Sequence, residues 1–235
     1  MIGDQIDVPE PALVVLIGPS GAGKTTLAAR LFARSEVLSS DALRAAVSGD
    51  EADQRATRPA FGILHREVRK RLAVGRLVVV DATNVEAPAR AVLRRIAAAA
   101  AVPAVAIVIQ LPPADVHERN RHRAGRIVPA DIVDRHLASL DRLGTSPATI
   151  VARLRAEGFA AVHVLSSAVE IDAVAIRRVT SMPKPTPDAG ASAVRDPAER
   201  SRPQLDPHAV AEIHVVATDV EGGLLIGGPD EDERG

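Results

Sequence analysis

The chain has 235 residues, a length that suits one α/β domain or one domain followed by a tail. Apolar residues make up 46% of it, but Trp and Tyr are absent and there are three Phe, so the core must be mostly aliphatic. The net charge of −1 gives no overall attraction to nucleic acid. The absence of cysteine excludes disulfides, thiolate metal sites and cysteine nucleophiles.

No apolar stretch approaches the roughly 20 residues that a helix needs to span a bilayer. Residues 1–11 are acidic and have neither the basic start nor the apolar run of a signal peptide. We therefore expect a cytoplasmic protein without a membrane partner. The sequence gives no indication of its oligomeric state.

The apolar pattern predicts strands that alternate with helices as far as residue 165. The first strand, residues 12–18, is a continuous apolar run, which is typical of a parallel strand buried on both faces. Further strands are expected at residues 36–39, 76–81, 104–111 and 161–165. Helices are expected at residues 24–33, 41–47, 58–74, 87–101, 113–123, 129–143 and 146–157. This alternation predicts an α/β fold, a three-layer sandwich around a five-stranded, doubly wound parallel sheet.

The composition changes near residue 180. Residues 181–207 contain six prolines and few apolar side chains, so we expect a disordered, proline-rich linker over residues 181–208. Residues 209–226 are apolar again, and we expect residues 209–235 to be a short tail that can form a hairpin. Residues 1–180 are then the folded domain.

A glycine-rich motif follows the first predicted strand and opens the first predicted helix. Gly18-x-x-x-x-Gly23-Lys24-Thr25 matches the Walker A pattern in full and in the structural context that it requires. Its backbone N–H groups are suited to the phosphates of ATP, Lys24 to the β- and γ-phosphates, and the Thr25 hydroxyl to Mg²⁺. The residues expected to bind the nucleotide are Gly18, Ser20, Gly21, Ala22, Gly23, Lys24, Thr25 and Thr26. The alternative, a glycine-rich turn that binds nothing, is disfavoured because pattern and context agree.

Lysine usage supports this interpretation of the motif. Only three of the 29 basic residues are Lys, and one of them is Lys24. A lysine is a compact point charge on a flexible stem, which suits a phosphate. Lys24 is therefore also a candidate catalytic residue.

A carboxylate and an arginine follow the second predicted strand. Asp41 comes directly after it, and Arg44 lies three residues further on. At the edge of the strand beside the P-loop strand, Asp41 would face the γ-phosphate and could accept the proton of an attacking hydroxyl. Arg44 could hold an anionic acceptor. The alternative is that Asp41 is a plain helix N-cap.

The third predicted strand ends in a Walker B-like pattern. Asp81 is its last residue and is placed to act on Mg²⁺, and Asn84 follows as a candidate contact of the acceptor. The alternative is that Asp81 or Asn84 caps the next helix. Both roles can coexist.

Arginines gather in residues 117–126, after the fourth predicted strand. Arg119 and Arg123 are four residues apart and share a helix face, and Arg126 follows a glycine. A mobile helical lid with such residues can clamp ATP phosphates and offset transition-state charge, which makes Arg123 a candidate catalytic residue. The alternative is a solvated basic face. The position after the fourth strand of a P-loop sheet favours the lid.

Five motifs together resemble the N-terminal kinase module of bacterial polynucleotide kinase-phosphatase, which belongs to the AAA_33 group of P-loop kinases. The similarity covers roughly residues 10–170. Its motifs are Gly-Pro-Ser-Gly-Ala-Gly-Lys-Thr-Thr (18–26), Val-Leu-Ser-Ser-Asp-Ala-Leu-Arg (37–44), Asp-Glu-Ala-Asp-Gln (50–54), Val-Val-Val-Asp-Ala-Thr-Asn (78–84) and Arg-Asn-x-x-Arg (119–123).

The resemblance implies transfer of the γ-phosphate of ATP to the 5′-hydroxyl of RNA or DNA. Asp41 would be the general base, and Arg44 would touch a substrate phosphate near the acceptor. Lys24 and Thr25 would hold ATP and Mg²⁺, and the lid arginines would be Arg119 and Arg123. The strand order in this group is 2-3-1-4-5.

Two alternatives stay open. Residues 209–226 lack the Gly-Asp-x-His-Gly signature of the phosphoesterase that follows this module in the family, and aromatic side chains that stack on bases are nearly absent. The acceptor could then be a small hydroxyl compound. The chain could also be a nucleotide-dependent ATPase or binding module that acts on a partner through residues 181–235.

Overall fold

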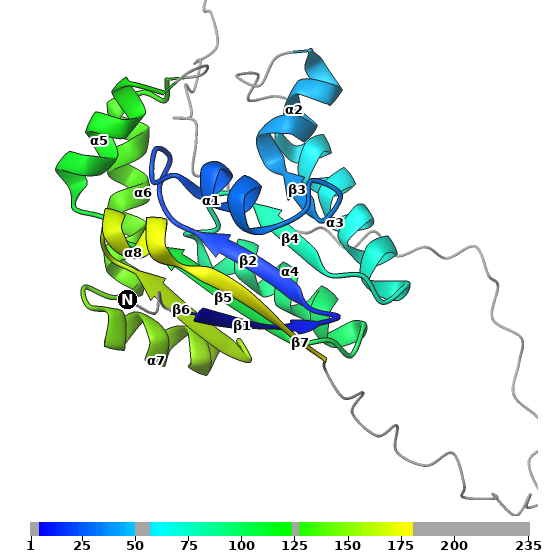
Figure 1. Ribbon diagram of the computed structural model, residues 1–235. Helices are drawn as coiled ribbons and strands as arrows, with labels where there is room; N and C mark the ends of the chain where they lie inside the picture. Colours follow the sequence, from blue (N-terminus) through cyan, green and yellow to red (C-terminus); the bar gives the residue numbers. More distant parts are fainter. Residues whose placement is uncertain (1–4, 50–56, 124–126, 181–235) are drawn as a thin grey trace, which may run out of the picture. The chain divides into compact units, whose positions relative to one another are not determined.

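The computed structural model describes residues 5–49, 57–123 and 127–180 (Figure 1). The predicted linker (181–208), the predicted tail (209–235) and the Asp-Glu-Ala-Asp-Gln motif (50–54) lie outside these residues. The domain boundary near residue 180 therefore stays a prediction. None of the helices in the described segments is long and apolar enough to cross a membrane.

A five-stranded parallel sheet forms the centre of the fold. Its strands are β2 (Leu13–Ile17), β3 (Val37–Ser39), β4 (Val78–Asp81), β5 (Ala104–Ile109) and β6 (Ala161–Leu165). Their spatial order is β3-β4-β2-β5-β6. This is the predicted order 2-3-1-4-5 when these five strands are counted along the chain, so the predicted fold class is confirmed. Every residue of β2, β4 and β5 is buried, which explains why their sequences are apolar throughout except for Asp81 at the end of β4.

Eight helices are present in the described part of the chain. They are α1 (Lys24–Leu31), α2 (Ser40–Ser48), α3 (Thr57–Ala73), α4 (Ala87–Ala99), α5 (Pro113–Arg121), α6 (Ala130–Leu143), α7 (Pro147–Glu157) and α8 (Ala168–Ala173). Seven of them lie where the sequence predicts helices, and α8 was not predicted. Local signals explain several ends. At α7, for example, Ser146 and Thr149 form a capping box, and Gly158 ends the helix in the left-handed conformation.

Two apolar clusters place the helices on the two faces of the sheet. One cluster joins the sheet to α3, α4 and α7 through Leu64, Leu93 and Leu154. The other joins it to α1, α5 and α8. Helix α6 contributes to both, with Leu137 in one and Leu140 in the other. The result is the predicted three-layer sandwich.

A second, two-stranded sheet was not predicted. Strand β1 (Gln5–Glu10) pairs in parallel with β7 (Ala175–Thr180), and Figure 1 shows the two side by side although they come from opposite ends of the described chain. Ile6 and Val8 of β1 belong to the same apolar cluster as α1. The apolar signal of β1 is short and is followed by Pro9 and Pro11, which argue against a strand. Residues 5–10 form a strand because they pair with β7.

The carboxyl ends of the five central strands meet at one edge of the sheet. The P-loop follows β2, the segment with Asp41 follows β3, and Asp81 ends β4. In open α/β sheets, ligands bind outside this edge. The fold therefore brings the predicted nucleotide and acceptor residues to the same place.

Candidate functional site

The P-loop joins β2 to α1 and is packed tightly against α5. Gly21 has a φ of 86°, and a Cβ there would lie 2.8 Å from the carbonyl oxygen of Val116 and 2.9 Å from Cβ of Asn120. Only glycine fits this combination of left-handed backbone and close contact. The loop is followed at once by the N-terminus of α1, whose free N–H groups favour an anion.

Lys24 lies inside this loop with 8% of its surface exposed. Its Nζ donates hydrogen bonds to the carbonyl oxygens of Gly18 (2.9 Å) and Pro19 (2.8 Å). Burial lowers the pKa of Lys24 to about 8, although the carboxylates of Asp81 and Asp41 oppose the shift. At neutral pH the side chain therefore remains mostly charged, without a carboxylate bonded to it. Such a cation is suited to a phosphate.

Thr25 and Asp81 are joined directly. The Thr25 hydroxyl donates to Oδ2 of Asp81 at 2.8 Å, and Asp81 is 4% exposed. Burial raises the pKa of Asp81, while Lys24 and the Thr25 hydrogen bond oppose the rise. Helix α4 has Glu86 as its N-cap, so the alternative that Asp81 or Asn84 caps this helix is wrong.

These two oxygen ligands fit Mg²⁺. Hard oxygen donors are what this ion prefers, and it is commonly held by one or two protein groups together with substrate phosphates and water. The described residues contain no group of three or more His, Asp or Glu that could hold a metal by themselves. When bound, Mg²⁺ would neutralise phosphate charge. That Thr25 and Asp81 hold it stays a prediction.

Asp41 lies in the first turn of α2, but it is not the N-cap. Ser39 has that role, because its side chain accepts a hydrogen bond from the Ala42 amide at 3.5 Å. The N-cap alternative for Asp41 is therefore wrong. Its carboxylate instead forms ion pairs with Arg44 and, at 3.4 Å, with Nη2 of Arg123.

Two arginines control the charge of this carboxylate. Burial raises the pKa of Asp41, but the attraction and hydrogen bonds of Arg44 and Arg123 outweigh burial and hold the pKa below its ordinary value. Asp41 is thus an anion at neutral pH. It is a weak base, but a well-held acceptor for the hydrogen bond of a hydroxyl group.

The two predicted lid arginines reach different parts of the site. Nη1 of Arg119 donates to the P-loop carbonyl of Ala22 at 3.5 Å, whereas Arg123 contacts Asp41. Figure 1 shows α5 and α6 on one side of the P-loop and α2 on the other. Arg123 therefore connects the two sides. Helix α5 ends at Arg121, two residues before the predicted end, and Arg126 lies outside the described residues.

Asn84 is placed differently from the other candidates. It is 3% exposed, has a φ of 49°, and donates through Nδ2 to the carbonyl oxygens of Leu16 (2.8 Å) and Ala82 (3.4 Å). Its side chain thus holds the ends of β2 and β4 together. Contact with an acceptor stays a prediction.

Sequence reasoning missed two contacts at this site. His136 of α6 bonds to the P-loop through Ser20, with 3.3 Å between Nδ1 and Oγ. Arg90 of α4 bonds to the loop that follows β4. Neither residue lies in a motif. Only the unusual position of an arginine in the first turn of a helix could have drawn attention to Arg90.

The AAA_33 family model, described as an AAA domain, matches residues 13–143. The chain belongs to the AAA_33 family. The matched range runs from the start of β2 to the end of α6. It therefore includes the P-loop, Asp41, Asp81 and both lid arginines, whereas α7, α8 and the two-stranded sheet lie outside it.

No curated protein matches this AAA_33 chain. Solved structures that overlap with it include a sugar kinase from a Janibacter species (20% identity, 66% of this chain and 85% of that one, TM-score 0.44) and a gluconokinase from Sinorhizobium meliloti (20%, 68% and 85%, 0.43). Another is the Pnkp1/Rnl/Hen1 RNA repair complex (20%, 57% and 45%, 0.48). These overlaps are too loose to indicate an activity.

Proposed function

We propose that this AAA_33 chain is an ATP-dependent kinase that transfers the γ-phosphate of ATP to the 5′-hydroxyl end of a polynucleotide. The observation that carries the proposal is the position of Asp41. Asp41 comes two residues after Ser39, which pairs with Asp81 across the sheet, and its carboxylate is held by Arg123 of the lid. A hydroxyl bonded to Asp41 would therefore lie next to the P-loop phosphates.

The donor side is the P-loop with its partners. The backbone N–H groups of the loop and Lys24 would hold the β- and γ-phosphates, and Arg119 would approach them from α5. Thr25 and Asp81 would hold Mg²⁺. Phosphoryl transfer passes through a loose transition state, so positioning and charge neutralisation are the main tasks of the protein.

The acceptor side begins with Asp41. Its carboxylate would orient the attacking hydroxyl by accepting its hydrogen bond, and would take up the proton as the new O–P bond forms and the bond to ADP breaks. Arg123 would turn from Asp41 toward the transferred phosphoryl group. Because the pKa of Asp41 is low, orientation matters more than basicity in this role.

Arg44 supports an anionic acceptor. Its side chain is 14% exposed, it is bonded to Asp41, and its buried Nε has no hydrogen-bond partner among the described residues. A phosphate of the substrate, close to the hydroxyl, would satisfy that donor.

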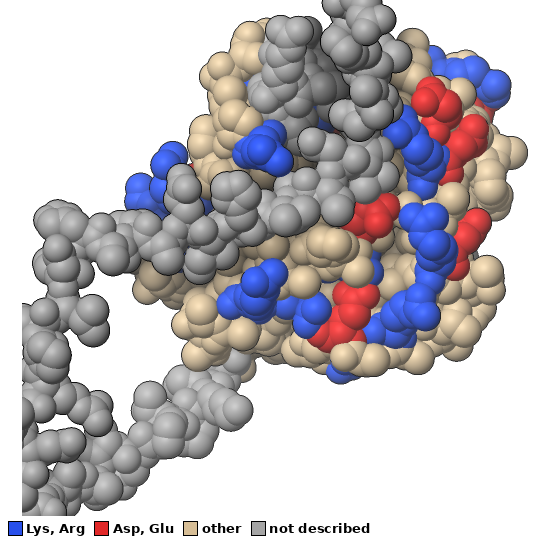
Figure 2. Space-filling view, turned by 180° about the vertical axis from the view of Figure 1, so that it is seen from behind, with Lys and Arg blue, Asp and Glu red and all other residues tan. Residues whose placement is uncertain are grey.

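A small anionic hydroxyl compound is the second candidate acceptor. On the face shown in Figure 2, a run of Lys and Arg side chains of the described residues has Asp and Glu side chains beside it. These carboxylates would oppose the binding of a long nucleic-acid backbone to the basic groups. The third alternative, a binding module that acts through residues 181–235, depends on residues outside the described segments.

The test is incubation with γ-labelled ATP, Mg²⁺ and an oligonucleotide that carries a 5′-hydroxyl. We expect label at its 5′ end, and none on the same oligonucleotide when its 5′ end is already phosphorylated. RNA and DNA versions separate the two polymers, and a panel of small sugar acids and nucleosides covers the second candidate. Absence of label on the oligonucleotide at high protein concentration would remove the leading proposal.

A further inference from the structure

Arg90 is a buried charge in a position that helix stability does not explain. It lies in the first turn of α4 and is 2% exposed. Its partner Glu157 is the last residue of α7. A helix carries partial positive charge at its N-terminus and partial negative charge at its C-terminus. Each of the two side chains therefore sits at the unfavourable end of its helix.

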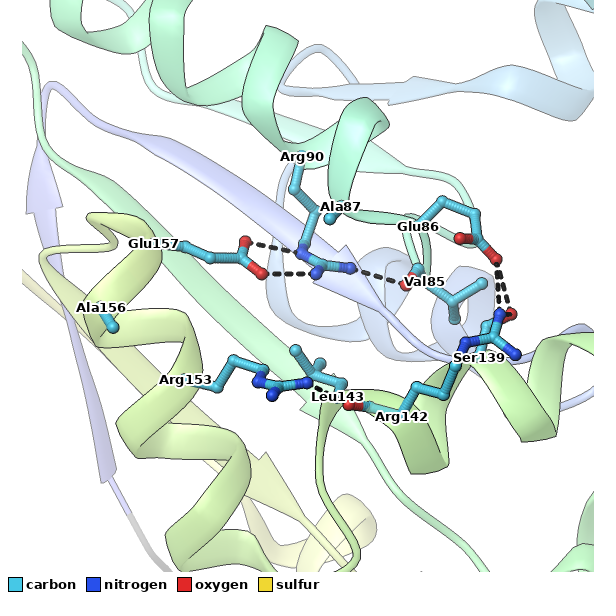
Figure 3. A pocket seen from close by; sticks show the side chains of 10 residues that line it. All are labelled: Val85, Glu86, Ala87, Arg90, Ser139, Arg142, Leu143, Arg153, Ala156 and Glu157. Carbon is cyan, nitrogen blue, oxygen red and sulfur yellow. Dashed lines mark hydrogen bonds and ion pairs between the residues drawn. The ribbon is translucent and has the colours of Figure 1, made fainter. Parts of the chain in front are cut away.

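The hydrogen bonds of Arg90 connect α7 with the loop between β4 and α4. Nε and Nη2 donate to the two carboxylate oxygens of Glu157 at 2.9 and 2.6 Å. Nη1 donates to the carbonyl oxygens of Asn84 (3.0 Å) and Val85 (2.7 Å). Figure 3 shows the guanidinium between Glu157 and Val85. Only the planar fork of an arginine can make these bonds together.

The other side of this loop meets the P-loop. Asp81 accepts the Thr25 hydroxyl, and the carbonyl oxygen of Thr83 accepts the amide of Gly18 at 3.0 Å. Asn84 has a positive φ, which asparagine tolerates better than most residues, and it donates to Leu16. Arg90 bonds to the carbonyl of this same residue, so it constrains the same turn.

A pocket of about 430 Å³ opens beside the Arg90–Glu157 pair (Figure 3). It is lined by Val85, Glu86, Ala87, Arg90, Ser139, Arg142, Leu143, Arg153, Ala156 and Glu157. Its polar groups bond to one another: the Ser139 hydroxyl donates to Glu86 at 2.5 Å and accepts from Arg142 at 2.6 Å. The charged groups of the wall thus bond mainly to one another, and the bond of Arg90 to the Asn84 carbonyl connects the wall with the loop that meets the P-loop.

We propose that Arg90 is a positioning residue for the phosphate and Mg²⁺ site. Arg90 holds residues 82–85 on the side of the loop that faces away from the P-loop. Asp81 and the Thr83 carbonyl can then keep Thr25 and Gly18 in place. The inference rests on the proposed function, because it takes MgATP as the ligand of that site. It does not depend on the identity of the acceptor.

Three variants and a control separate positioning from simple stabilisation. Arg90→Met alone leaves Glu157 buried without its partner, which can destabilise the fold. Arg90→Met/Glu157→Met removes both charges, and such apolar replacements of a buried pair often keep stability. Arg90→Lys keeps the charge but loses the fork, and provides a folded variant should the double variant fail to fold. The control is Arg94→Met, one turn further along α4, where the guanidinium lies over Phe159 at 6.0 Å from the ring centre.

The readouts are direct binding and hydrogen exchange. Binding of a non-hydrolysable ATP analogue is measured by calorimetry across a Mg²⁺ series, and exchange of the Gly18 amide is measured without nucleotide. We expect Arg90→Lys and the double variant to bind the analogue about 10-fold more weakly and to need about 10-fold more Mg²⁺, as is usual when a group that orients a metal ligand is lost. The Gly18 amide should exchange faster. Arg94→Met should match the wild-type protein in all three measurements.

The inference is overturned if the double variant, or Arg90→Lys, binds the analogue with wild-type affinity and Mg²⁺ dependence. Rescue of both stability and binding in the double variant would show that the pair only holds α4 to α7. If the wild-type protein itself binds no analogue, the proposed function fails. The exchange of the Gly18 amide then still decides whether Arg90 fixes the loop, and an unchanged rate would refute it.

Discussion

The donor and acceptor sides of the site are built in different ways. Lys24 and Asp81 are 8% and 4% exposed. Backbone carbonyl groups of the P-loop hold Lys24, and the Thr25 hydroxyl holds Asp81. The side chains of Asp41 and Arg123 are 30% and 29% exposed and meet from α2 and from the segment after α5. The donor side is therefore rigid and buried, and the acceptor side is half-open and made of side chains that can rearrange. This difference predicts that changes on one side can be separated from changes on the other.

The largest effect is expected on the acceptor side. Asp41→Asn removes the charge that orients and deprotonates the hydroxyl, and should lower the rate of phosphoryl transfer by about 10²- to 10⁴-fold. Affinity for an ATP analogue, measured by calorimetry, should change less than about threefold. Asp131→Asn, an exposed carboxylate on α6, is the control. Equal losses in transfer and in nucleotide affinity would show that the two sides are not separable.

Lys24→Met should act on the donor side. We expect nucleotide affinity to fall by about 10²-fold, because a charge-assisted bond to phosphate is lost. The nucleotide-free protein should nevertheless become more stable by about 1–3 kcal/mol, since burial of this cation is unfavourable. Chemical denaturation measures this gain. A loss of stability would show that the hydrogen bonds of Lys24 to Gly18 and Pro19 outweigh the unfavourable burial of its charge.

Arg44→Ala tests whether the acceptor is an anion. For an anionic acceptor we expect KM to rise by about 10- to 100-fold, the usual worth of a hydrogen bond between charged groups. KM for ATP, and for any neutral acceptor that is used, should stay unchanged. Steady-state kinetics with both substrates varied give the answer, and Arg66→Ala, an exposed arginine on α3, is the matched control. An unchanged KM for the anionic acceptor would remove Arg44 from substrate binding.

A change of pH should also affect the donor and acceptor sides differently, but with a smaller effect than these substitutions. Above pH about 8, Lys24 loses its proton in the folded protein. Nucleotide affinity should therefore fall several-fold between pH 7.5 and 9, and binding in this range should take up a proton. The free energy of unfolding should change in the opposite direction and rise with pH. Folding lowers the pKa of Lys24, so its charge destabilises the folded protein below pH 8, and this destabilisation is lost as the pH rises from about 8 toward the unfolded value of 10.5.

Calorimetry in buffers of different ionisation enthalpy detects the proton that accompanies binding. Lys24→Met is the reference for both effects, because it lacks the titrating group. On the acceptor side, the lowered pKa of Asp41 predicts no loss of its charge until the pH falls below the ordinary range of an aspartate. Nucleotide affinity that is flat between pH 7.5 and 9 would contradict the assignment to Lys24.

The smallest effect on the site is expected from the two-stranded sheet. Val8→Ala removes fully buried apolar surface in β1 and should lower the free energy of unfolding by about 2 kcal/mol. Nucleotide affinity and transfer at low temperature should not change, because β1 pairs with β7 and its ion pairs are with Arg177 and Arg178 of that strand. Denaturation and binding measured on the same preparation test this. A selective loss of transfer would show that β1 reaches the acceptor side.

The donor side could be predicted because its information is local. The Walker A spacing, the buried strand before it and Asp81 at the end of β4 all lie within short, patterned segments. Alternation of strands and helices predicted a parallel sheet, whereas its strand order came from the resemblance to the P-loop kinases. The acceptor side was predicted only in part. The sequence placed Asp41 and Arg44 one turn apart, but their connection to Arg123 depends on folding across 82 positions.

The features that were missed depend on distant partners. Strand β1 has two inward apolar residues and becomes a strand only against β7. The Arg90–Glu157 pair joins residues 67 positions apart, and helix rules disfavour both of its members where they stand. The N-cap alternatives for Asp41 and Asn84 were reasonable from composition, and only the observed caps, Ser39 and Glu86, decided against them.

The pairing of β1 with β7 has a consequence for the order of events during synthesis. Asp7 and Arg177, which form an ion pair across the two strands, are 170 positions apart. At a translation rate of roughly 5–20 residues per second, the ribosome needs on the order of 10–30 seconds to make β7 after β1. Over that interval β1 has an open edge, while the central sheet and the P-loop can already assemble. The first described strand of the chain is therefore among the last to find its place.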